Sequence, residues 1–112
     1  MGDKYIVTAA HCLYLLHDGS PPAWQWITPS EVKVRVGDTT LDEEFEATSF
    51  TIEVANIKQH PDYESDSQIK NDIAVLELTE PVSLTEYPNI KPICLPEAGA
   101  LFPGEAIMSG WG

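Results

Sequence analysis

The feature that most constrains the fold of this chain is a series of short segments in which apolar and polar residues alternate. Residues 32–36 read Val-Lys-Val-Arg-Val and end at Gly37. Strict alternation is typical of a half-buried strand, because successive side chains of a strand point to opposite faces of the sheet. The pattern recurs over residues 50–54, and Ile57 continues the apolar set after a one-residue slip. The sequence therefore predicts two half-buried strands in its middle part.

Two further segments predict strands for other reasons. Residues 5–8 are a short run of high β-propensity. Residues 72–78 are almost continuously apolar, which suggests a strand buried on both faces. Residues 9–12 break the alternation and are expected to form a helical turn, whereas residues 13–31 follow no regular period and are interpreted as a loop.

The last third of the chain is rich in proline. Residues 79–105 contain five prolines and are expected to be an extended connection across a surface. Residues 106–112 are predicted to begin another strand. Short strands separated by turn signals, without a strong amphipathic helix, favour an all-β barrel or sandwich.

Length and charge narrow the class of protein. The chain has 112 residues, which suits one domain, and it has no apolar run near the roughly 18 residues of a membrane span. Its net charge of −12 argues against nucleic acid and anionic membranes as partners, since both require basic patches, and mainly indicates solubility. Met1 is not followed by a basic segment and an apolar core, so no signal peptide is predicted within these residues.

The main candidate for chemistry is His11, in the segment "VTAAHC". An imidazole titrates near neutral pH and can therefore accept and return a proton, although a histidine can also be a metal ligand or a packed core residue. A histidine base works best when a carboxylate holds its second nitrogen. Asp72 is a candidate for that role, because a carboxylate at the start of an apolar strand is expected to have a hydrogen-bond partner.

Several short motifs in the sequence resemble those of a known family. The segments that carry the resemblance, in chain order, are "YIVTAAHC", "VRVGD", "HPDY", "NDIAVLEL", "KPICLP" and "SGWG". Together they resemble the trypsin-like (chymotrypsin-fold) serine endopeptidases over nearly the whole chain. The resemblance implies an all-β fold of two antiparallel barrels, hydrolysis of protein or peptide substrates through an acyl-enzyme, His11 as general base and Asp72 as its orienting carboxylate.

The departures from the family pattern are equally informative. The sequence contains no Gly-Asp-Ser-Gly-Gly nucleophile motif, and Ser109 lies in a segment that the family uses structurally. The resemblance therefore implies a partial peptidase domain over 1–112, with the N-terminal barrel over about 1–80, the inter-barrel connection over about 81–105, and the first strand of the second barrel over 106–112. We expect the isolated chain to lack peptidase activity, and an incomplete barrel to expose unpaired strand edges and apolar surface.

The two cysteines, Cys12 and Cys94, are too few for a disulfide framework. By themselves they could pair with each other, stay free, or bond outside this chain. The resemblance implies the last of these: Cys12 would pair with an upstream residue, and Cys94 with a propeptide or regulatory domain. It also implies a secreted, extracellular parent protein.

Two loops carry further expectations. The segment "SPPAWQW" resembles insertion loops that narrow the substrate cleft in coagulation-type proteases, so Trp24 or Trp26 could cap a substrate subsite or could anchor the loop by packing. The acidic residues between 38 and 46 lie where some family members bind calcium, but a solvated acidic loop is the favoured interpretation, and no cofactor is predicted.

A different function class stays open at this point. A non-catalytic homologue of these proteases keeps the barrels, loses the nucleophilic serine and acts as a binding or regulatory module. Retention of both His11 and Asp72 favours an active endopeptidase, because a homologue without activity has no need of either residue.

Overall fold

The computed structural model describes residues 4–17, 23–38, 49–64 and 68–110. These residues form an all-β structure without an α-helix. The elements are β1 (Tyr5–Thr8), η1 (Ala10–Leu13), β2 (Tyr14–His17), β3 (Ala23–Trp26), η2 (Pro29–Glu31), β4 (Lys33–Val36), β5 (Phe50–Gln59) and β6 (Ala74–Leu78), where η denotes a 3-10 helix. Within the described ranges, neither helix is long or apolar enough to cross a membrane.

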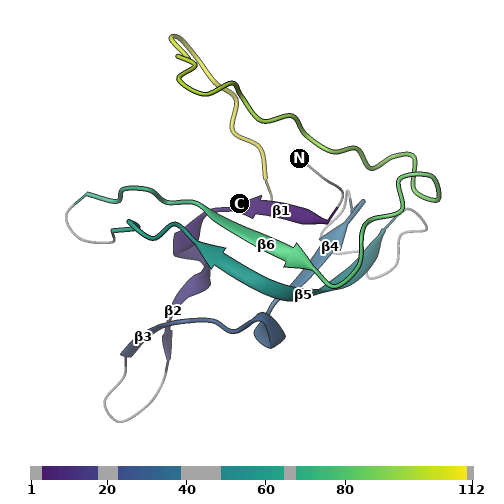
Figure 1. Cartoon of the computed structure of the whole chain (residues 1–112), viewed down its shortest axis with the longest axis horizontal. Coiled ribbons are helices and arrows are strands. Elements are labelled where there is room, and N and C mark those ends of the chain that lie inside the picture. The colour runs from purple at the N-terminus through teal and green to yellow at the C-terminus, as the bar shows by residue number, and fades with distance from the viewer. Residues whose placement is uncertain (1–3, 18–22, 39–48, 65–67, 111–112) are drawn as a thin grey trace.

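Four strands form one curled antiparallel sheet in the order β1-β6-β5-β4 (Figure 1). The central strands β5 and β6 were predicted from alternation and from the apolar run. The register of the β5–β6 pair shifts between Val54 and Asn56, so one extra residue bulges at this point. This bulge is the one-residue slip that the sequence shows before Ile57. The curled sheet is half of a barrel, which confirms the predicted all-β class.

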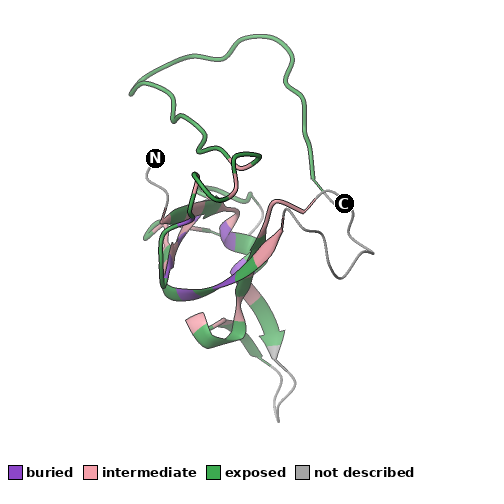
Figure 2. Ribbon diagram, turned by 90° about the vertical axis from the view of Figure 1, so that its right-hand side faces the viewer, coloured by how far each residue is buried: buried purple, intermediate pink, exposed green. Residues whose placement is uncertain are grey.

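The hydrophobic core lies on one face of this sheet (Figure 2). Alternate residues of β5 and β6 supply most of it, and η1 closes one end. Among the residues that the structure describes, the buried ones are Ala10, Leu13, Ile52, Val54, Ala74, Leu76, Leu78 and Val82. The opposite face of β6 is only half-buried, because Val75 and Glu77 alternate with the buried residues. The expectation of burial on both faces of this strand is therefore met on one face alone.

The interpretation of residues 13–31 as a loop was wrong for residues 14–17 and 23–26, which form strands, whereas residues 18–22 lie outside the described part. Strands β2 and β3 pair as an antiparallel hairpin, with Tyr14 opposite Trp26 and Leu16 opposite Trp24. Figure 1 shows that this hairpin projects away from one end of the four-stranded sheet. Aromatic cross-strand contacts stabilise the hairpin, and such contacts have no signature in the hydrophobic periodicity of a single strand.

The C-terminal segment follows the predicted course only in part. Residues 91–110 are exposed and run away from the sheet as an extended chain (Figure 2). The strand predicted over 106–112 is not formed over residues 106–110, and residues 111–112 lie outside the described part. A strand needs a neighbour that pairs with its backbone, and Ile107 and Met108 are 97% and 96% exposed. The assignment of this segment to a second barrel stays a prediction.

Candidate active site

The position of His11 follows from the short helix that carries it. Strand β1 ends at Thr8, and η1 then buries the side chains of Ala10 and Leu13 in the core. A 3-10 helix has three residues per turn, so burial of two residues three positions apart directs the residues between them outward. His11 and Cys12 are accordingly exposed, and the imidazole keeps 57% of its side-chain surface accessible to solvent.

Strand register explains why Asp72 lies beside His11 although the two are far apart in sequence. In the antiparallel pair of β1 and β6, Thr8 is opposite Ala74. The end of β1 therefore meets the beginning of β6. His11 follows this point by three residues, and Asp72 precedes it by two. The sheet thus brings together two residues that the sequence alone could only nominate.

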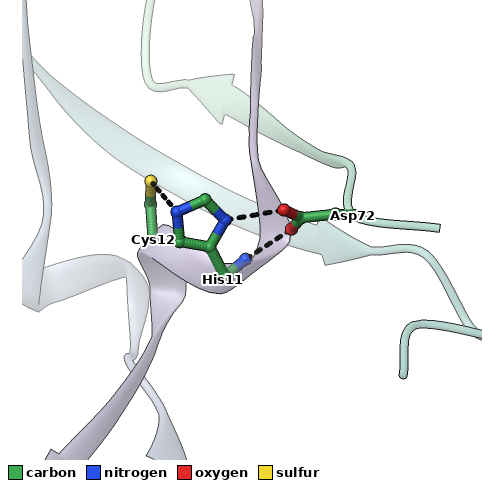
Figure 3. Close-up of polar contacts among 3 residues, drawn as sticks. All are labelled: His11, Cys12 and Asp72. Carbon is green, nitrogen blue, oxygen red and sulfur yellow. Dashed lines mark hydrogen bonds and ion pairs between the residues drawn. The ribbon is translucent and has the colours of Figure 1, made fainter. Parts of the chain in front are cut away.

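The carboxylate of Asp72 accepts two hydrogen bonds from His11 (Figure 3). The ring nitrogen Nδ1 lies 2.6 Å from Oδ2, and the backbone N–H of His11 donates to Oδ1 over 2.8 Å. The short ring-to-carboxylate distance is that of a charge-assisted hydrogen bond. Two bonds to one carboxylate fix both the position and the rotation of the imidazole.

The same contacts decide the protonation state of Asp72. Hydrogen bonds from the side chain and then the backbone of His11 hold the pKa of Asp72 below its usual value, and they outweigh the opposing effect of desolvation. Asp72 is therefore an ionised acceptor at neutral pH, and the proton of the neutral imidazole resides on Nδ1. The second ring nitrogen, Nε2, then carries a lone pair that can accept a proton.

Cys12 is the neighbour of this second nitrogen. Its Sγ atom lies 3.7 Å from Nε2 of His11, so the thiol can donate a weak hydrogen bond to the lone pair (Figure 3). Both Cys12 and Cys94 are exposed and free in the structure. Their predicted bonds to residues outside this chain stay predictions.

An aromatic pocket adjoins the imidazole. It has a volume of about 390 Å³ and is lined by His11, Tyr14, Trp24 and Tyr63. Tyr14 stacks on Trp24 with a centroid distance of 5.7 Å and an interplanar angle of 22°. Tyr14 also meets Tyr63 edge-on at 6.4 Å, so the rings support one another as a pre-formed wall.

The two candidate tryptophans have different surroundings. Trp24 is 58% exposed and lines the pocket beside His11. Trp26 packs partly against the hydrophobic core. Its ring centroid lies 4.8 Å from that of Tyr14 and 5.5 Å from that of Tyr63. One indole therefore lines the pocket, while the other packs toward the core.

Sequence reasoning did not single out Tyr14 and Tyr63 as lining residues. Tyr63 belongs to the segment "HPDY", which contributed to the family resemblance, so that motif was a usable signal. Burial and then the nearby charge of Asp72 raise the pKa of Tyr63 above its usual value, which keeps the phenol protonated. Tyr14 gave no signal, because its position was interpreted as part of a loop.

The acidic loop suggested as a calcium site lies outside the described residues, except for Asp38. The Oδ2 atom of Asp38 forms an ion pair with Nε of Arg35 at 2.7 Å. Among the residues that the structure describes, no three acidic, histidine or cysteine side chains gather closely enough to hold a metal ion.

Comparison of the sequence with known proteins identifies the family of this chain. The trypsin family model matches residues 1–112. Mannan-binding lectin serine protease 1 from Homo sapiens is 33% identical over 115 aligned residues, and transmembrane protease serine 9 from Rattus norvegicus is 32% identical over 114. All of this chain is covered in both alignments, but only 16% and 9% of the respective relatives. The 112-residue chain therefore belongs to the trypsin family of serine proteases.

Proposed function

We propose that this chain supplies the general base and the orienting carboxylate of a serine endopeptidase. The observation that supports the proposal most directly is the hydrogen bond of 2.6 Å between Nδ1 of His11 and Oδ2 of Asp72, in a chain of the trypsin family. This contact leaves Nε2 as the nitrogen that accepts a proton. The substrates are proteins or peptides, as for other serine proteases.

In the proposed mechanism, Nε2 of His11 removes the proton from a serine hydroxyl as that oxygen attacks the scissile carbonyl carbon. Asp72 keeps the proton on Nδ1 and stabilises the imidazolium that forms. The imidazolium then protonates the leaving amine as the carbon–nitrogen bond breaks. A water molecule then hydrolyses the acyl-enzyme, with the same histidine as base. This step regenerates the free serine hydroxyl.

The nucleophile in this proposal comes from a part of the protein outside these 112 residues. The sequence contains no Gly-Asp-Ser-Gly-Gly segment. The isolated chain is accordingly proposed to be inactive. The exposed thiols of Cys12 and Cys94 are proposed to form disulfides beyond this chain, Cys94 with a propeptide or regulatory domain, in a secreted protein.

Trp24 is proposed to form one wall of a substrate subsite. Its exposed indole lines the pocket next to His11, and a side chain of the substrate near the scissile bond would lie against it. Trp26 is assigned the anchoring role instead, because its ring packs toward the core.

A fluorophosphonate probe tests the central proposal, because it phosphonylates only an activated serine, with fluoride as the leaving group. We expect labelling of the full-length protein that contains this chain and none of residues 1–112 alone. In the full-length protein, His11→Ala should lower kcat for a peptide substrate by about 10⁶-fold, and Asp72→Asn should lower it by about 10⁴-fold. The matched control is Lys58→Ala, an exposed position of β5, which should leave kcat unchanged.

Two other outcomes of the labelling experiment would contradict the proposal. Labelling of a serine in the isolated chain would contradict the external nucleophile. A folded full-length protein that is not labelled even after cleavage from its propeptide would instead be a non-catalytic homologue that acts by binding.

A further inference from the structure

Asn71, the residue before Asp72, has an unusual backbone conformation. Its φ angle is +56°, and it is the one non-glycine residue with positive φ among the residues that the structure describes. Asparagine enters this left-handed region more readily than most residues with a Cβ atom. Such conformations persist only where the surroundings hold them, and they are enriched at functional sites. The contacts around Asn71 show what holds it.

The side chain of Asn71 is fastened to the neighbouring loop. Its Nδ2 donates a hydrogen bond of 3.0 Å to the backbone carbonyl of Asp62. The backbone N–H of Asp62 in turn donates to Nδ1 of His60 over 3.0 Å. The loop that receives the amide of Asn71 is therefore itself held in place.

The residue on the other side of Asp72 is tied to the same loop. The carbonyl of Ile73 accepts a hydrogen bond of 3.0 Å from the backbone N–H of His60. The backbone N–H of Ile73 donates back to the carbonyl of Asn71 over 2.8 Å, which closes a tight turn around Asp72. Asp72 is thus held between two anchored neighbours.

We propose that Asn71 is a positioning residue that aims the carboxylate of Asp72 at His11. Both oxygens of this carboxylate must meet separate donors on His11, at 2.8 and 2.6 Å, which requires a defined direction of the Asp72 side chain. The left-handed turn at Asn71 sets that direction, and its amide locks the turn to the loop. The consequence for catalysis rests on the proposed endopeptidase function, whereas the geometric role does not.

Two substitutions remove the side-chain hydrogen bond of Asn71 while they keep its left-handed backbone conformation. Asn71→Gly keeps the positive φ angle without strain but removes the donor. Asn71→Asp keeps the tendency toward this conformation but offers an oxygen, which cannot donate to the carbonyl of Asp62. Asn56→Asp makes the same chemical change on an exposed position of β5 and is the matched control.

The experiment is NMR of the full-length protein that contains this chain. The readouts are the low-field resonance of the His11 Nδ1 proton and the titration of the Asp72 carboxyl. In both Asn71 variants we expect the low-field resonance to weaken or move upfield, and the pKa of Asp72 to rise toward its ordinary value. Asn56→Asp should leave both signals as in the wild type.

The proposal is overturned if both Asn71 variants keep the wild-type resonance and titration. Unfolding of Asn71→Gly would also contradict it, because the amide would then support the whole fold and not the direction of one carboxylate. In the full-length enzyme, the variants should lower kcat by about ten- to a hundredfold with little change in KM. An inactive wild-type protein that still shows the NMR effect would refute the endopeptidase function and leave the positioning role intact.

Discussion

At the scale of single residues, the proposed chemistry of this chain depends on one contact between His11 and Asp72. The carboxylate is ionised because it accepts hydrogen bonds from both the ring and the backbone of the histidine. The same hydrogen bonds that orient the imidazole therefore also make the stability of the folded state depend on pH. A group whose pKa is lowered by folding stabilises the folded state while it is ionised.

This linkage predicts the effect of Asp72→Asn on acid stability. In the wild type, the contribution of Asp72 is fully present above its unfolded pKa of 3.8 and is lost as the pH falls through the lower folded value. We expect Asp72→Asn to destabilise the chain at neutral pH and to reduce the difference between its urea midpoints at neutral pH and at about pH 3. Glu97→Gln, on the exposed C-terminal segment, is the control. An unchanged pH dependence in Asp72→Asn would show that its carboxylate is not the linked group.

At the scale of elements, the β2–β3 hairpin forms part of the aromatic pocket beside His11. Pairing of β2 with β3 places Tyr14 and Trp24 on one side of the hairpin, where their rings stack. Leu15 and Gln25 alternate with them and therefore point to the other side. The two faces of one small element thus allow a matched comparison.

The hairpin predicts a change in substrate selectivity. In the full-length protein, Trp24→Ala should lower kcat/KM for extended peptide substrates by about two- to twelvefold, since a lost aromatic contact is worth about 0.5–1.5 kcal/mol. Small ester substrates that do not reach the pocket should be hydrolysed as before. Gln25→Ala, from the opposite face, should change neither. Equal losses for both substrate types in Trp24→Ala would point to a general disturbance of the site.

At the scale of the whole molecule, the chain divides into a packed sheet and an extended apolar segment. The buried residues come from η1, β5, β6 and Val82. Beyond residue 90, several large apolar side chains are exposed. They are Ile93, Leu95, Leu101, Phe102, Ile107 and Met108. A segment that buries little apolar surface has little free energy holding it in place.

This division predicts the order of proteolytic cleavage. Thermolysin, which cuts beside apolar residues, should cleave the isolated chain within residues 93–108 before it cleaves β5 or β6. Mass spectrometry of early fragments measures this order. Leu101→Ser together with Phe102→Ser should slow the cleavage near these positions and leave the other fragments unchanged. First cuts inside Phe50–Gln59 would show that the sheet is not the stable part of this chain.

The sequence predicted the strands in which buried and exposed residues alternate regularly. The alternation over 32–36 and 50–54, and the slip before Ile57, correspond to β4, β5 and the bulge. The hairpin was missed because its strands are stabilised by rings meeting across the strands, and periodicity along one strand does not record such contacts. The strand expected after residue 105 did not form in the described part, since propensity without a pairing neighbour leaves backbone groups unsatisfied.

The sequence by itself determined which residues could do the chemistry: an imidazole that titrates near neutrality, and a carboxylate at the head of an apolar strand. Only the tertiary structure decided that His11 and Asp72 meet, because the register of β1 against β6 sets their separation. It also decided that Asn71 is left-handed beside them and that Trp24, and not Trp26, lines the pocket. These outcomes depend on contacts between segments distant in the chain, which local sequence patterns do not encode.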